Sequence, residues 1–161
     1  MFRKILMTTT ALFLANAAFA QDVTLIEEVT VEADITAITN AEAAAYWTNA
    51  AGDLENAILA RLVDRTGEVG SKIMIDIDEL SLANSFQNQL GLEDAVLVGM
   101  VNVLNETDGP KSDNYELTVT AQSAQAFAPD GTVLDGAFTD TLEYYAALIA
   151  AFADGVVSRL E

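Results

Sequence analysis

Residues 95–104 read Ala-Val-Leu-Val-Gly-Met-Val-Asn-Val-Leu, and the prediction of the fold starts from this stretch. Almost every position is apolar, and valine, which favours strands, is the commonest residue. The stretch is too short to cross a bilayer as a helix, which requires about 20 apolar residues. A short, continuous apolar run of this kind predicts a β-strand buried on both faces, at the centre of a sheet.

The segments on either side of this strand predict its partners. Residues 72–82 alternate between apolar and polar until the pattern shifts near Asp78-Glu79, which predicts a strand with a bulge. After the central strand, residues 105–113 are rich in turn-forming residues. Residues 115–122 then alternate again, so we expect a half-exposed strand that runs to about Phe127 and forms a hairpin with the central one.

One more strand and two helices complete the pattern. Residues 21–35 alternate with an exception at Glu27-Glu28, which predicts a half-exposed strand that is bulged there. Apolar residues recur at helical spacing over residues 41–64 and again over residues 140–160. Each helical pattern follows a hydroxyl or carboxylate residue at the spacing of a capping box, which favours a helix start there.

The expected order is therefore β-α-β-β-β-α. The simplest packing for this order is an α+β two-layer sandwich, with a mostly antiparallel four-stranded sheet and both helices on one face. The first strand, the first helix and the second strand are expected to form a crossover connection.

The first 20 residues have the features of a secretory signal peptide. Residues 1–4 are basic, an apolar run follows over residues 5–14, and Ala18-Phe19-Ala20 supplies a small-x-small cleavage pattern. The alternative, a membrane anchor, is disfavoured because the apolar run is too short to span a bilayer. We therefore expect cleavage after Ala20, a single α/β domain over residues 21–161, and a periplasmic or secreted protein with no stable membrane insertion.

Charge and composition narrow the classes of function. All 25 acidic residues lie beyond residue 20 against five Lys and Arg, so the mature chain carries a net charge of −20. Such a surface repels nucleic acids and anionic lipids, so neither is an expected partner. The sequence has no Cys and no His, which removes most transition-metal ligands and most nucleophile–base pairs. We therefore predict a protein that is not an enzyme.

The central strand provides the candidate binding surface. If Leu97, Gly99, Val101 and Val103 face the helices, the alternate residues face the other side of the sheet, where only Asn102 is polar. The apolar residues predicted on that side are Val96, Val98, Met100 and Leu104. An exposed apolar strip there would bind a protein partner or an apolar ligand, or would join copies of the chain in a homo-oligomer. The alternative is that residues 83–92 or 128–138 fold over it.

A weaker hypothesis is a Ca²⁺-dependent or carboxylate-based enzyme, and two groups of oxygen-bearing side chains are its candidates. Asp76 and Asp78 project from one strand face, and paired carboxylates bind Ca²⁺ or act as acid and base. The alternative is a solvated strand face in a very acidic chain. A second group lies in the hairpin loop, although its spacing does not match a DxDxDG calcium loop. Its members are Asn105, Glu106, Asp108, Asp113 and Asn114. No other cofactor is expected.

The order of elements resembles that of small exported accessory domains, such as the auxiliary proteins of envelope lipid transporters, which pair a sheet with two helices. The resemblance covers the mature chain at the level of element order and carries over no residues. It implies an envelope accessory role without catalysis. Those proteins are usually lipoproteins, and this chain departs from them because it has no Cys to carry the lipid.

Overall fold

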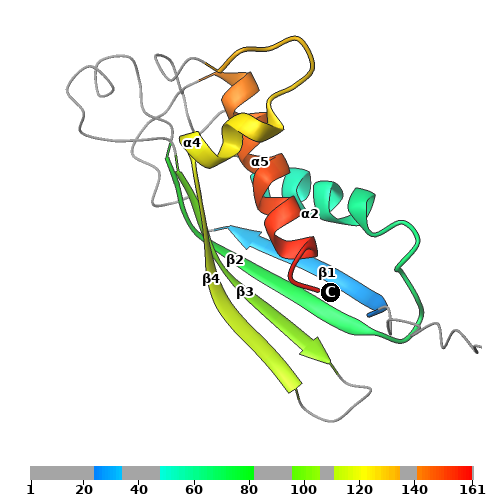
Figure 1. The fold of residues 1–161 in the computed structure, drawn as a ribbon. Helices are drawn as coiled ribbons and strands as arrows, with labels where there is room; N and C mark the ends of the chain where they lie inside the picture. The colour runs from blue at the N-terminus through cyan, green and yellow to red at the C-terminus, as the bar shows by residue number, and fades with distance from the viewer. Residues whose placement is uncertain (1–23, 34–47, 82–95, 106–110, 135–140, 161) are drawn as a thin grey trace, which may run out of the picture.

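The protein consists of a sheet covered on one face by helices (Figure 1). The computed structural model describes residues 24–33, 48–81, 96–105, 111–134 and 141–160. The strands are β1 (Ile26–Ala33), β2 (Ser71–Ser81), β3 (Val96–Asn105) and β4 (Lys111–Thr120). The helices are α2 (Ala50–Arg61), α4 (Ala121–Ala124), the 3₁₀ turn η2 (Gln125–Phe127) and α5 (Leu142–Val157).

The strands follow one another across the sheet in the order β1-β2-β3-β4. β1 is parallel to β2, while the β2–β3 and β3–β4 pairs are antiparallel. A parallel pair requires a crossover connection, and α2 lies in the connection between β1 and β2. The predicted α+β two-layer sandwich is confirmed, with a mixed sheet in which β3 is an inner strand.

Both predicted bulges are present. The pairing of β1 with β2 shifts register between Ile26 and Glu28. The pairing of β2 with β3 shifts between Ile77 and Glu79. Beyond the second shift Leu80 packs against the core, which explains why the apolar alternation of β2 changes phase in the sequence.

The prediction that the last strand runs to Phe127 is wrong, because β4 ends at Thr120. The Thr120 hydroxyl accepts a hydrogen bond from the Ser123 backbone N–H at 3.3 Å. In return, the Ser123 hydroxyl oxygen accepts one from the Thr120 backbone N–H at 2.9 Å. This reciprocal capping starts α4, and η2 continues it, so the described residues contain a third helix that the predicted order lacks.

The two longer helices occupy the predicted regions with shifted ends. The start of the predicted helix 41–64 lies partly outside the described residues, and its described part, α2, ends three residues early. The predicted helix 140–160 corresponds to α5. Its cap is Thr141, whose hydroxyl accepts a hydrogen bond from the Tyr144 backbone N–H at 3.3 Å.

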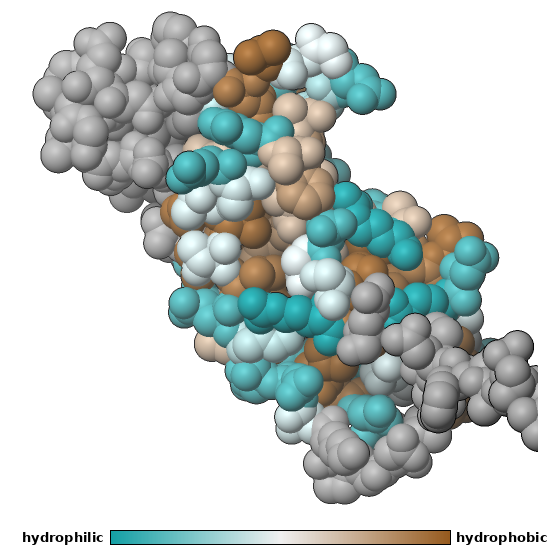
Figure 2. Space-filling view, viewed as in Figure 1, coloured by the Kyte–Doolittle hydropathy of each residue, from teal (hydrophilic) through white to brown (hydrophobic). Residues whose placement is uncertain are grey.

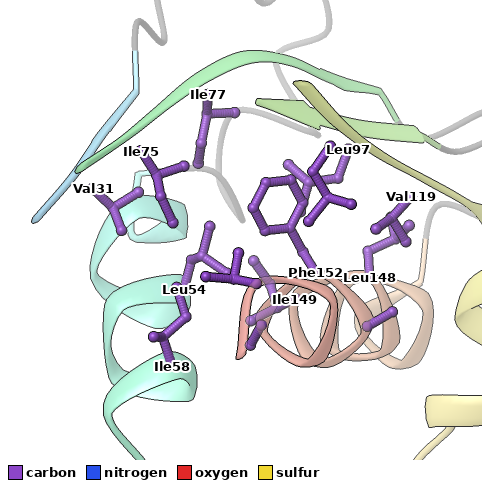
Figure 3. Packing of buried hydrophobic residues seen from close by; sticks show 14 of the residues in the cluster. Val31, Leu54, Ile58, Ile75, Ile77, Leu97, Val119, Leu148, Ile149 and Phe152 are labelled. Carbon is purple, nitrogen blue, oxygen red and sulfur yellow. The ribbon is translucent and has the colours of Figure 1, made fainter. Parts of the chain in front are cut away.

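The core lies between the helices and one face of the sheet (Figure 3). Leu54 of α2 lies toward the sheet, Ile58 lies further from it on the side of α2 that faces α5, and Phe152 of α5 points toward the middle of the sheet. Burying side chains of this size stabilises the fold by about 1.5–3 kcal/mol each. The largest fully buried side chains are Tyr144, Phe152, Ile26, Leu54, Ile58, Leu62, Ile73, Ile75, Leu97, Leu148 and Val101.

Gly99 lets α5 approach the central strand closely. A Cβ atom at this position would lie 2.9 Å from the Asp76 carbonyl oxygen and 3.2 Å from Cζ of Phe152. Any side chain here would therefore push Phe152 or β2 away. The one residue without a side chain in this apolar strand marks the place where the helix layer rests on the sheet.

Polar contacts connect the two long helices at their outer side. The Tyr145 hydroxyl donates a hydrogen bond to the Asp53 carboxylate at 2.6 Å. Burial, with this hydrogen bond as a smaller cause, raises the pKa of Tyr145 above its ordinary value. Arg61 of α2 also donates to the Ala150 carbonyl of α5 at 3.1 Å. On this side of the molecule, hydrophilic side chains are interspersed with hydrophobic areas (Figure 2).

Candidate binding surface

The two faces of β3 differ in burial. Leu97 and Val101 point toward the helices and are completely buried. The four predicted site residues lie on the other face, which carries no helix in Figure 1, and each is partly exposed. We call these four residues, Val96, Val98, Met100 and Leu104, the open-face strip. They do not belong to the buried core cluster or to the partly buried hydrophobic residues packed against it.

Polar residues border the open-face strip on both neighbouring strands. Met100 lies opposite Asp76 of β2 and Glu116 of β4, and both carboxylate residues are exposed. Val98 lies opposite Thr118 of β4. The strip is therefore narrow, with one apolar column along β3 between two polar columns. An apolar surface with a polar rim is typical of a recognition site.

The middle of the strip is interrupted by a polar pair. The Asn114 side-chain amide donates a hydrogen bond to the Asn102 side-chain oxygen at 2.6 Å. On the other side Asn102 lies opposite Met74, whose side chain is 43% exposed. Met74 is absent from the predicted strip, although the alternation of β2 places it on the same face as Asp76. Met74 widens the apolar surface toward β2.

Of the two segments expected to cover this face as the alternative, residues 128–138 are described as far as Leu134. Leu134 packs against the core cluster, as does Phe127 just before this segment. Residues 83–92 and 135–138 lie outside the described residues. Within the described part of the chain, the strip residues are partly exposed and no helix lies over them.

Asp76 and Asp78 are both exposed, Asp76 in the middle of β2 and Asp78 at the register shift between Ile77 and Glu79. Asp76 also lies opposite Glu32 of β1, so acidic residues of two strands are neighbours on this face. Among the described residues, no three His, Cys, Asp or Glu side chains lie close enough together to hold a metal ion. The Asp76–Asp78 site stays a prediction from sequence.

The second predicted group of oxygen ligands is only partly within the described residues. Glu106 and Asp108 belong to residues 106–110, which lie outside them. Asn105 ends β3, while Asp113 and Asn114 lie in β4 with exposed side chains. The described members are therefore strand residues rather than parts of a calcium-binding loop.

The strip ends near a small cluster of charges. Lys72 lies opposite Leu104 and pairs with the carboxylates of Glu27 and Glu28, at 3.4 Å and 3.8 Å. Each of these side chains keeps at least 30% of its surface exposed, so solvent screening leaves the pairs with little net stability. At β4, the opposite edge strand of the sheet, the Arg159 guanidinium lies 4.3 Å from the centre of the Tyr115 ring. Burial raises the pKa of Tyr115, and the Arg159 charge opposes this shift.

No protein-family description and no curated protein matches this sequence. Similar solved structures include a Xanthomonas campestris protein of the DUF330 family, which shares 14% identity at a TM-score of 0.49 and covers 90% of this chain and 88% of its own. A dodecameric PelC variant from Paraburkholderia phytofirmans shares 12% identity at a TM-score of 0.42, with 85% and 86% covered. A Caulobacter crescentus protein described as a candidate lipoprotein shares 15% identity at a TM-score of 0.38, with 84% and 89% covered. At these values the likeness carries no functional inference.

Proposed function

We propose that this protein is an exported, non-enzymatic binding module of the cell envelope that uses the open face of its sheet to hold a protein partner or an apolar ligand. The observation that carries the proposal is the open-face strip. Four apolar side chains of an inner strand are partly exposed on the face without helices. Burying them against a partner is the most direct gain in free energy that this face offers.

Composition supports the non-enzymatic part of the proposal. The sequence supplies neither His nor Cys, so acid–base or nucleophilic chemistry would depend on carboxylates, Tyr, Lys, Ser or Thr. The described carboxylates on the open face, such as Asp76 and Glu116, are exposed strand residues. Exposed carboxylates keep water as their main partner and lack the shielded environment in which catalytic groups are tuned.

Export is the second part of the proposal and depends on residues 1–20. The basic start, the apolar run and the Ala18-Phe19-Ala20 pattern support a cleaved leader followed by one domain over residues 21–161, in the periplasm or secreted. None of the helices in the described part of the chain has the length and apolarity needed to cross a membrane.

Replacing Met100 with Lys tests the proposal, because it places a charge in the middle of the strip. Thr30→Lys is the matched control, since it adds the same charge to the same face of β1, away from the strip. If the strip is open, circular dichroism melts will show Met100→Lys folded, with a loss of stability below about 1 kcal/mol. If Met100→Lys is instead already unfolded before heating, the chain itself covers the strip.

Binding is then measured with the same variants. The purified wild-type protein, Met100→Lys and Thr30→Lys are each incubated with a periplasmic extract, and the retained proteins and extracted lipids are identified by mass spectrometry. We expect a partner or lipid retained by the wild type and by Thr30→Lys to be lost with Met100→Lys. Equal retention by all three would contradict a role for the strip.

A homo-oligomer formed through the strip is the competing interpretation. Size-exclusion chromatography with light scattering separates the two, because Met100→Lys would then convert an oligomer into a monomer without any extract present.

A further inference from the structure

The two edges of the sheet are built differently. At the outer edge of β1 the Ile26 backbone N–H donates to the Arg65 carbonyl at 2.7 Å, and the Gly67 N–H donates to the Ile26 carbonyl at 3.0 Å. β1 is also bulged, and its exposed side chains include Glu28 and Glu32. Bulges, charges and a covering loop are the usual devices that prevent another strand from pairing with an edge.

β4, at the other edge, shows fewer of these devices. Its ten residues pair with residues 96–105 without any shift in register, and they include no Gly and no Pro. Its exposed side chains include Asp113 and Glu116, so charge is present at this edge as well, but the other exposed ones, Ser112, Asn114, Thr118 and Thr120, are uncharged. In the part of the chain that the structure describes, β3 is the only strand paired with β4. A long, regular edge of this kind is a template for another strand.

We propose that a second copy of the chain pairs with β4 through its own β4, antiparallel, about a two-fold axis at Tyr115. A strand pairs with itself only if directly opposite residues lie on the same face, so the axis must pass through a residue rather than between two. Centring the pair on Tyr115 overlaps residues 111–119 of both copies. It joins two four-stranded sheets into one continuous sheet and keeps the helices of both copies on the same side.

Charge favours this register over the neighbouring one centred on Glu116. With the axis at Tyr115, Asn114 lies opposite Glu116 of the second copy, twice by symmetry. The Asn114 amide donates one N–H to Asn102 and has a second N–H for that carboxylate. Moving the axis by one residue, to Glu116, would place this carboxylate opposite its own copy, which is destabilising.

The net charge of the two copies opposes their association and supplies a test. Each mature chain carries 25 acidic residues against five basic ones, so the copies repel each other. Salt screens this repulsion beyond about 10 Å at 0.1 M and leaves the directly paired strands in place. We therefore expect the dimer to strengthen as the salt concentration rises, measured by sedimentation velocity over a concentration series of the purified protein.

Charge reversal across the axis tests the register. Asn114→Glu places two Glu–Glu pairs opposite each other and should weaken dimerisation by about tenfold or more. Adding Glu116→Lys to this variant creates two Glu–Lys pairs and should restore the dimer. Thr30→Glu, which adds the same charge at the β1 side of the same face, should leave dimerisation within about twofold of wild type, with circular dichroism confirming that each variant is folded.

Three outcomes would overturn the proposal: a wild-type protein that stays monomeric at every concentration and salt, equal losses from Asn114→Glu and Thr30→Glu, or no recovery in the double variant. The open-face strip is tested separately, because Met100→Lys should leave this dimer intact. Loss of the dimer in Met100→Lys but not in Asn114→Glu would assign self-association to the strip instead.

Discussion

Val98 and Val101 are three residues apart on the same strand and have identical side chains, yet their surroundings differ completely. Val101 is fully buried beneath the helices, whereas Val98 is partly exposed on the face that they leave open. The comparison shows that composition does not decide burial in an apolar strand. The helix layer decides it, since side chains alternate between a covered and an uncovered face.

The two faces of the sheet should differ most in how much stability is lost when a large side chain is removed from each. Phe152→Ala opens a cavity above Gly99 and should lower the free energy of unfolding by about 3–5 kcal/mol. Met100→Ala on the open face should cost less than about 1 kcal/mol, since water already reaches the side chain. Urea denaturation of both variants measures the difference. Similar losses would mean that the open face is packed as tightly as the covered one.

The two valines give a smaller and more direct comparison. Val101→Ala should lower the free energy of unfolding by about 2 kcal/mol, because it removes buried methyl groups from a packed core. Val98→Ala should cost less than half of that. Thermal melts monitored by circular dichroism measure both losses of stability. Equal losses would contradict the assignment of Val98 to an open face.

The smallest effects are expected from the acidic residues beside the strip. Asp76→Asn and Asp78→Asn should each change the free energy of unfolding by no more than about 0.5 kcal/mol, because both side chains are exposed. Replacing Asp76 also relieves repulsion from Glu32, so a slight gain is expected there. Melts with and without added Ca²⁺ provide the control. A calcium-induced rise in Tm that both variants abolish would favour the calcium-dependent alternative over a solvated strand face.

Much of the fold follows from alternation along the chain. The phase change near Asp78-Glu79 predicted a bulge, and the pairing confirms one between Ile77 and Glu79. The end of β4 could not be predicted in the same way. Its cap joins two hydroxyl residues, Thr120 and Ser123, whereas a recognisable capping box pairs a hydroxyl with Glu or Gln. The alternation of the strand continues only to Gln122 and then breaks at Ser123, the residue whose side chain makes the cap.

The candidate surface was only partly predictable. Parity along the central strand placed Val96, Val98, Met100 and Leu104 on one face, and the structure puts all four there. Met74 and the Asn102–Asn114 hydrogen bond depend on which residues of neighbouring strands lie opposite one another. The bulge in β2 and the β3–β4 hairpin set which residues of these strands lie opposite one another. The sequence of one strand alone does not reveal this.

The parallel pairing of β1 has a consequence for how the polypeptide acquires its structure. Of the described strands β1 is made first, but β2, the strand with which it pairs in the described part of the chain, begins 45 residues later. The β2–β3–β4 meander is built from neighbouring segments, whereas β1 must wait for a distant one and close a large loop. Until then β1 has no strand to pair with and only α2, which packs on β1, is available to cover Val29 and Val31, so we expect the nascent chain to depend on chaperones at this end.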